Sequence, residues 1–184
     1  MSKLSIVSVS SKEFSDVCDL INKSHPDECV ISIHKIENEQ FETAFEECRK
    51  MLTEKRGVAP TQMRAFHGCS TESATNIAHN GFLKSQNKVS AYGIGTYFGG
   101  FYNVSRSYSM TKKQDKYTYH ALIIADILLG KMGRSASGNN IDLTNMDVSV
   151  DNFTSPSIIS LPIDDAAIPR YYVQFYYQAE QRRY

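Results

Sequence analysis

The sequence predicts one domain of the α+β class, and three observations lead to that prediction. An amphipathic helix pattern lies in the first half of the chain, the most apolar segment has the composition of a buried strand, and further strand patterns follow near the C-terminus. A chain of 184 residues, 41% of them hydrophobic, has the size of one ordinary globular domain. Because helices come early and strands late, a mixed α+β arrangement fits better than regular βαβ alternation.

The first two elements differ in their hydrophobic period. Residues 29–36 (CVISIHKI) alternate apolar and polar side chains, which predicts a half-buried strand. From Gln40 to Lys55 the apolar side chains recur at helical spacing, with Glu and Lys on the other face, which predicts an amphipathic helix. Gly57 and Pro60 end this helix.

A second strand and helix follow. Met63 to Gly68 has the pattern of a short strand. Ser70 or Thr71 is suited to cap a helix that runs through Ala78, and Asn80-Gly81 is the kind of pair that ends one. Residues 84–90 are polar, which predicts a loop.

The second half of the chain is dominated by strand patterns. After a glycine-rich stretch at 92–100, residues 102–110 fit a helix or turn. Residues 117–130 (YTYHALIIADILLG) are aromatic and β-branched, which predicts the central buried strand. A loop is expected at 133–140, then strands at 157–161 and 170–177 separated by an Asp-Asp turn and Pro169.

Charge and hydropathy exclude several classes of protein. Twenty basic residues balance twenty acidic ones without a Lys/Arg run, which argues against a nucleic-acid binder. The longest apolar stretch, 121–129, contains Asp126 and falls far short of the about 20 residues that cross a bilayer. Residues 1–10 lack a signal-peptide pattern. We therefore expect a cytoplasmic or nuclear protein, neither secreted nor membrane-bound.

The four cysteines do not form a metal-binding pattern. Cys18, Cys29, Cys48 and Cys69 stand 11, 19 and 21 residues apart, with no C-x-x-C pair. Structural zinc is not expected, and small semi-buried thiols in a reducing compartment account for at least three of them.

Several short motifs occur in a characteristic order. The glycine-rich stretch alone is unspecific, because it lacks the third glycine of a dinucleotide fingerprint and the Lys-Ser/Thr of a P-loop. Together the motifs resemble the catalytic domain of the poly(ADP-ribose) polymerase family, over Ser5 to Gln178. They are Val30 to Asn38, Phe66-His67-Gly68, Ile77 with Asn80-Gly81-Phe82, Tyr92 to Phe98 with Ser105 and Tyr108, Ala125 to Lys131, Asp151-Asn152-Phe153 with Pro156-Ser157-Ile158, and Ile168 to Tyr171.

This resemblance implies a fold and a reaction. The fold would be the diphtheria-toxin-like ADP-ribosyltransferase fold, with two packed antiparallel sheets and peripheral helices in one domain spanning 1–184. The reaction would be a glycosyl transfer in which NAD loses nicotinamide and ADP-ribose passes to a protein acceptor, without a metal. We expect a monomer without nucleic-acid partners.

The resemblance also implies roles for individual residues. Gly68 would offer backbone N–H and C=O to the nicotinamide carboxamide, and the Ser105 hydroxyl would add a third hydrogen bond. Tyr108 and Tyr97 would cover the two faces of the nicotinamide ring. His67 would bind a hydroxyl of the adenosine-side ribose. Cys69, which follows His-Gly in the donor site, replaces the Ser or Thr of many relatives and removes a good hydroxyl partner for NAD.

The third catalytic position departs from the polymer-forming pattern. By resemblance, His67 and Tyr97 are the first two members of a His-Tyr-Glu triad, and Ile158 occupies the third position. An aliphatic side chain cannot accept a hydrogen bond or a proton, so transfer of a single ADP-ribose unit is expected. The alternative is a catalytically inactive relative that binds NAD or another protein. A nucleic-acid-modifying transferase of the same fold is disfavoured by the neutral charge.

Overall fold

The computed structural model describes residues 2–22, 28–86, 88–109, 112–114 and 117–178. The helices are α1 (Lys12–Asn22), α2 (Glu39–Arg56), α3 (Thr71–Asn80) and α4 (Tyr102–Arg106), with short 3₁₀ turns η1 (Lys84–Gln86) and η2 (Asp164–Ala166). The strands are β1 (Lys3–Ile6), β2 (Glu28–Glu37), β3 (Thr61–Cys69), β4 (Lys88–Ser90), β5 (Gly93–Gly99), β6 (Lys112–Gln114), β7 (Tyr117–Leu129), β8 (Met132–Gly133), β9 (Val148–Val150), β10 (Ile158–Leu161) and β11 (Ala167–Gln178).

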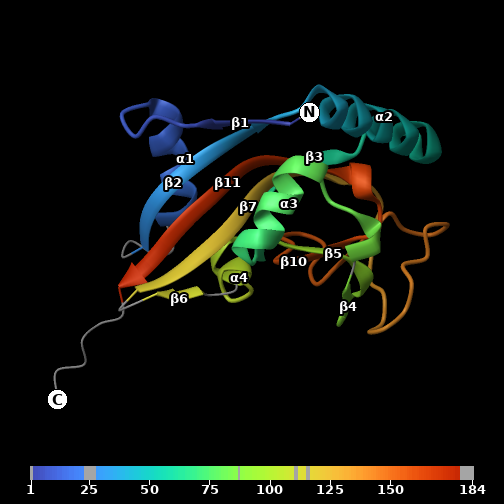
Figure 1. Cartoon of the computed structure of the whole chain (residues 1–184). Helices are drawn as coiled ribbons and strands as arrows, with labels where there is room; N and C mark the ends of the chain where they lie inside the picture. Colours follow the sequence, from blue (N-terminus) through green and yellow to red (C-terminus); the bar gives the residue numbers. More distant parts are fainter. Residues whose placement is uncertain (1, 23–27, 87, 110–111, 115–116, 179–184) are drawn as a thin grey trace, which may run out of the picture.

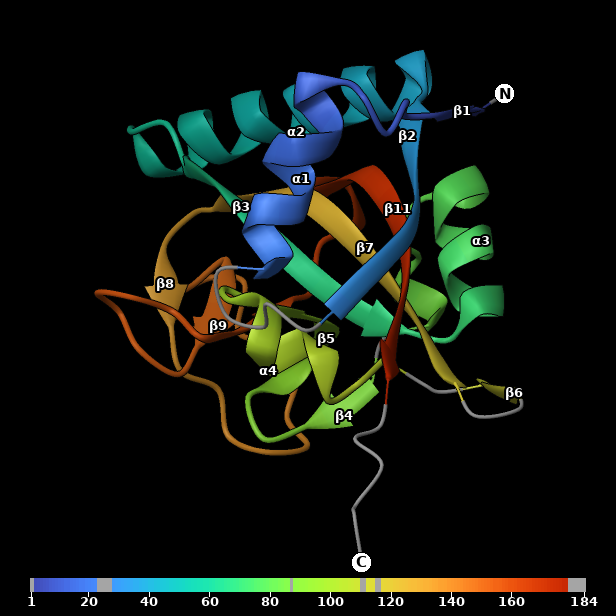
Figure 2. The same cartoon turned by 90° about the vertical axis from the view of Figure 1, so that its left-hand side faces the viewer.

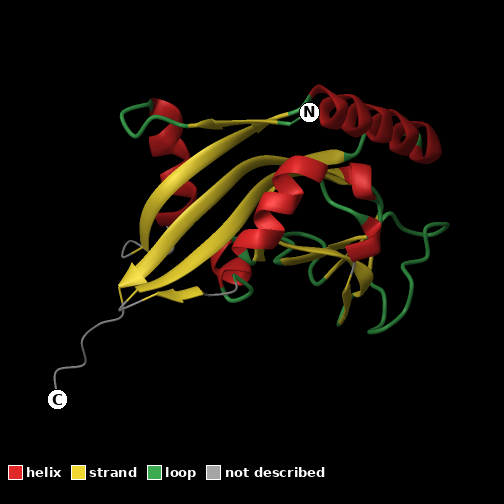
Figure 3. Ribbon diagram, viewed as in Figure 1, coloured by secondary structure: helices red, strands yellow, loops and turns green. Residues whose placement is uncertain are grey.

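The strands form one continuous sheet with two parts (Figure 1, Figure 3). Its order is β1-β2-β11-β7-β3-β5-β10-β9-β8, while β4 pairs with β5 and β6 with β7. A single register pair, Phe66 with Gly99, joins β3 to β5, so the larger part from β1 to β3 and the smaller part from β5 to β8 are nearly separate. The α+β fold is confirmed. The expected two antiparallel sheets are joined into one in the structure, and its strands β8 and β9 are parallel.

Two apolar cores lie on the two faces of the larger part, because alternate residues of a strand point to opposite faces. On one face, α2 and α3 pack with the smaller part of the sheet. On the other face, Val17 and Ile21 of α1 and Tyr102 of α4 pack on Phe66 and Leu122. Figure 2 shows α1 and α3 on opposite sides of β2, β11 and β7. None of the helices in the described part combines the length and apolarity needed to span a bilayer.

Helices α2 and α3 match their predicted boundaries because their end signals are local. The Asn38 side chain accepts a hydrogen bond from the amide of Gln40, and Gly57 ends α2 in the left-handed region at φ 72°. The Ser70 hydroxyl caps α3 through the amide of Ser73. Helix α2 also buries Phe45, Cys48 and Leu52, and full burial of a Phe or Leu side chain stabilises a fold by about 1.5–3 kcal/mol.

Several elements differ from the sequence prediction. The N-terminal β1 and α1 have no counterpart in it, and the segment expected as a loop at 84–90 contains η1 and β4. The glycine-rich stretch forms strand β5. Pro169 lies inside β11 rather than before it, at a point where the register with β7 shifts. A proline fits there because such an irregularity relieves the need for a ladder N–H.

Candidate active site

The candidate active site begins where strands β3 and β5 part. The carbonyl of Phe66 accepts a hydrogen bond from the Ser105 hydroxyl at 2.7 Å, so it faces β5 and α4 rather than β7. Backbone polar groups of residues two apart in a strand face the same side. The N–H and C=O of Gly68 therefore also face this side, beyond the single pair that joins β3 to β5.

His67 is held in one orientation by the backbone of β5. Its Nδ1 lies 2.7 Å from the carbonyl oxygen of Tyr97. A carbonyl only accepts hydrogen bonds, so Nδ1 carries the proton and Nε2 is the acceptor in the neutral ring. The imidazole also contacts the rings of Phe82 and Phe98, with centroids 5.5 and 5.7 Å away.

Tyr97 is fixed by the turn that precedes it. Its hydroxyl donates to the carbonyl of Gly93 at 2.6 Å and accepts from the amide of Tyr92 at 3.0 Å. Gly93 has a φ of 90°, and a Cβ there would lie 2.8 Å from the Ser135 hydroxyl. A side chain at this turn is therefore excluded both by conformation and by space.

Helix α4 and the turn after it bring two backbone polar groups against Gly68. Ser105 is buried, and its hydroxyl accepts from the Gly99 amide at 3.0 Å while it donates to Phe66. A Cβ on Gly68 would lie 2.0 Å from the Ser105 carbonyl and 2.9 Å from the Ser109 amide. Among the residues that the structure describes, the buried Ser109 hydroxyl has no hydrogen-bond partner. Tyr108, by contrast, is 68% exposed, so its ring is accessible for stacking.

Ile158 is the first residue of β10 and pairs with Gly99, while Tyr97 pairs with Ser160. Tyr97 and Ile158 are therefore diagonal neighbours on one face of the smaller part of the sheet. The Asp151 carboxylate accepts from the amides of Ser157 at 2.9 Å and Ile158 at 3.0 Å. These bonds lower the pKa of Asp151 against the opposing effect of burial. Asp151 thus fixes the start of the strand that carries Ile158.

Not every expected site residue is available to a ligand. Cys69 is 8% exposed and lies in the apolar core with α3. Cys48 is also buried, which raises the pKa of its thiol to about 11, while Cys18 is partly buried and Cys29 exposed. Within the described residues, no group of three His, Cys, Asp or Glu side chains is arranged to hold a metal ion.

Sequence reasoning missed Asp151 as a positioning group, because the pairing of its carboxylate with Ser157 and Ile158 depends on a hairpin loop. The loop contains an Asx turn, in which the side-chain oxygen of Asn152 accepts hydrogen bonds from the amides of Thr154 and Ser155. The local signal that indicates it is the Asp-Asn pair after β9.

Comparisons with a family model and with curated proteins give one consistent family. A family model for the poly(ADP-ribose) polymerase catalytic domain matches residues 11–170. The human protein mono-ADP-ribosyltransferase PARP14 is 26% identical over 176 residues, covering 90% of this chain and 10% of that protein. The mouse protein mono-ADP-ribosyltransferase PARP9 is 27% identical over 152 residues, covering 77% of this chain and 17% of that protein. The chain thus spans a small fraction of these relatives. It belongs to the poly(ADP-ribose) polymerase catalytic domain family, whose domains use NAD as substrate.

Proposed function

We propose that this chain is an NAD-dependent protein mono-ADP-ribosyltransferase, which moves one ADP-ribose unit to an acceptor side chain and releases nicotinamide. The observation that carries the proposal is the convergence of His67, Tyr97 and Ile158 at the parting of β3 and β5. The first two are linked by a hydrogen bond, and the third is an aliphatic neighbour of Tyr97.

The residues present fit the donor substrate. The close packing of Gly68 against α4 leaves no room for a side chain, and its backbone groups face the edge where a carboxamide would bind. Tyr108 offers an exposed ring, and Tyr97 would cover the other face of the nicotinamide. His67 would accept a hydrogen bond at Nε2 from a ribose hydroxyl. The Ser109 amide packs against Gly68, and the buried Ser109 hydroxyl has no hydrogen-bond partner among the described residues. Such a hydroxyl is a polar group of the kind that a bound ligand satisfies.

In the proposed reaction, the bond between nicotinamide and ribose breaks with its electron pair leaving on nicotinamide, and an acceptor atom bonds to the anomeric carbon. The chain contributes by holding donor and leaving group aligned. Ile158 cannot take a proton from the acceptor. A first transfer therefore requires an acceptor that is already a carboxylate or is deprotonated by another group, and elongation at a ribose hydroxyl is not supported.

Two substitutions test donor binding and turnover separately. A benzamide-type nicotinamide mimic should raise the thermal midpoint of the wild-type protein by mass action. Tyr108→Ala should abolish that shift, because the exposed ring that stacks on the mimic is lost.

His67→Ala should lower NAD consumption by about 100-fold or more, since a group that orients the donor is lost. If the mimic binds but wild type and His67→Ala are equally inactive, the catalytically inactive binding module is the better description. An unchanged shift in Tyr108→Ala rejects the donor site.

The length of the product tests the role of Ile158. With labelled NAD, the modified protein should run as one discrete band, and the label should resist a glycohydrolase that cuts only ribose–ribose bonds, because Ile158 offers no acceptor atom. A high-mass ladder sensitive to that enzyme contradicts both the position of Ile158 in the triad and the single transfer.

A further inference from the structure

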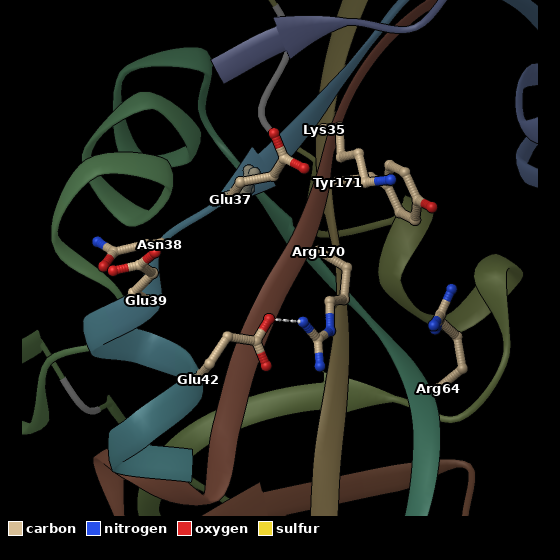
Figure 4. Close-up of a pocket in the computed structure, with 9 residues that line it drawn as sticks. Lys35, Glu37, Asn38, Glu39, Glu42, Arg64, Arg170 and Tyr171 are labelled. Carbon is tan, nitrogen blue, oxygen red and sulfur yellow. Dashed lines mark hydrogen bonds and ion pairs between the residues drawn. The ribbon is translucent and has the colours of Figure 1, made fainter. Parts of the chain in front are cut away.

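A pocket of about 420 Å³ lies between the first turn of α2 and strands β2, β3 and β11 (Figure 4). Arg64, which lines it, precedes His67 by three residues on β3, so the two side chains point to opposite faces of the sheet, about 10 Å apart along the strand. This pocket is therefore distinct from the candidate active site.

A buried carboxylate orients two arginines that line the pocket. Asp126 is 5% exposed. Its Oδ1 accepts from Nε of Arg64 at 2.7 Å, and its Oδ2 accepts from Nε of Arg170 at 2.8 Å. Each guanidinium is planar and is held at Nε by Asp126, and Nη1 of Arg170 is also hydrogen-bonded to Glu42. The arginines are thus preorganised before any ligand arrives.

The charges of the pocket are separated into two ends. Figure 4 shows Glu37, Glu39 and Glu42 on the side of α2, with Lys35 and Arg64 on the other side and Arg170 between. Glu42 is hydrogen-bonded to Arg170, which neutralises the centre. No cation lies within ion-pair distance of Glu39 among the described residues. The α2 end therefore keeps an uncompensated carboxylate.

At the end of the pocket opposite α2, the guanidinium of Arg64 is available to a ligand. Arg64 is bound through Nε alone, and within the described part of the chain its two terminal nitrogens have no partner. Its guanidinium lies over the ring of Tyr171, 5.9 Å from the centroid, and its side chain is 40% exposed. Lys35 is already paired with Glu13 at 3.0 Å. Arg64 is thus the group that can receive a carboxylate through two parallel hydrogen bonds.

We propose that this pocket docks a peptide segment of a partner protein in which an acidic side chain stands close to a basic one. The acidic group would bind the terminal nitrogens of Arg64, and the basic group would bind Glu39. A dianion such as phosphate is disfavoured, because the carboxylates of Glu37 and Glu39 line the opposite end. The glutamates and Arg64 are exposed at the surface, so an extended chain can reach both ends. This inference goes beyond the proposed transferase function and does not depend on it.

Fluorescence anisotropy with a labelled, acetylated Gly-Glu-Gly-Lys-Gly peptide tests the pocket. The peptide should bind about fivefold more tightly than its Glu→Gln and Lys→Gln versions, as expected for one partly exposed ion pair at each end. Arg64→Lys, which keeps a charge for Asp126 but lacks the planar fork, should remove the preference for Glu. The surface variant Glu39→Gln should remove the preference for Lys, and Glu72→Gln on α3 should change neither.

Nitrogen NMR of the Arg64 side chain locates the binding. Its signals should shift with the Glu-Lys peptide and not with the doubly neutral Gln-Gln peptide. Equal affinity for all peptides, or preferences retained in both Arg64→Lys and Glu39→Gln, overturns the proposal. Inorganic phosphate that shifts the Arg64 signals at lower concentration than the peptide also overturns it and makes the pocket a simple anion site.

Discussion

At the scale of single residues, the candidate site depends on side chains that are small or absent. Gly68 and Gly99 let α4 approach both strands, and the Ser105 hydroxyl binds to the backbone of each. The motif order predicts His67, Tyr97 and Ser105 as site residues. It did not reveal that the hydroxyl of Ser105 bridges Phe66 and Gly99, because that contact joins residues 39 and 6 positions away.

Gly68→Ala tests this close packing. The new Cβ would lie 2.0 Å from the Ser105 carbonyl, so α4 must move, and overpacking of this kind costs about 1–3 kcal/mol. We expect urea unfolding to show that loss, together with loss of nicotinamide-mimic binding. Gly57→Ala is the matched control. Its φ is 72° but no atom lies within 4 Å of the added Cβ, so it should cost about 1 kcal/mol of backbone strain and leave binding intact. Equal effects of the two variants contradict the assigned packing.

At the scale of elements, prediction succeeded where signals are local. Caps and hydrophobic period define α2 and α3, and the apolar run defines β7. It failed for β5, because glycine is depleted in strands and here serves close approach to α4 and Ser160. It also failed for α1, whose apolar side chains become informative only when the second core is known.

Helix α2 is also anchored at its C-terminal end by a buried carboxylate. Asp147 accepts from Lys55 at 2.7 Å and from Arg56 Nε at 2.9 Å, and the amide of Lys131 donates to it at 2.8 Å. Burial opposes its ionisation, but these hydrogen bonds outweigh it and lower the pKa of Asp147 from 3.8 to about 2. A carboxyl with a lowered pKa stabilises the fold above its ordinary pKa and loses that contribution as the pH falls toward the folded value.

Asp147→Asn should therefore destabilise the protein by about 2 kcal/mol at pH 7. The difference from wild type should shrink between about pH 4 and pH 2, where wild-type Asp147 takes up its proton. Urea unfolding at several pH values measures this. Asp16→Asn is the control, because Asp16 pairs with Lys12 on the surface of α1 and such pairs contribute little. A pH-independent difference for Asp147→Asn would show that the carboxylate is not the cause.

At the scale of the whole molecule, composition and period predicted the α+β class, and the ordered motifs indicated the family. Neither predicted that Arg64 and Asp126, 62 positions apart, would pair across β3 and β7. Nor did they predict the bulge that places Arg170 on the same carboxylate. The register between strands that are distant in the sequence determines these contacts. A shift of one residue in that register moves every side chain of the strand to the other face of the sheet.

The incomplete seam between the two parts of the sheet has a consequence for how such a site can arise. A complete ladder between β3 and β5 would pair the N–H and C=O of every residue that faces the other strand. Here the seam consists of one pair, Phe66 with Gly99, and the Ser105 hydroxyl of α4 bridges that pair by accepting from the Gly99 amide and donating to the Phe66 carbonyl. Among the described residues no strand pairs with Gly68 on this side. In the proposed donor site, the N–H and C=O of Gly68 would therefore bind the carboxamide through the backbone alone, without a specialised side chain for that contact.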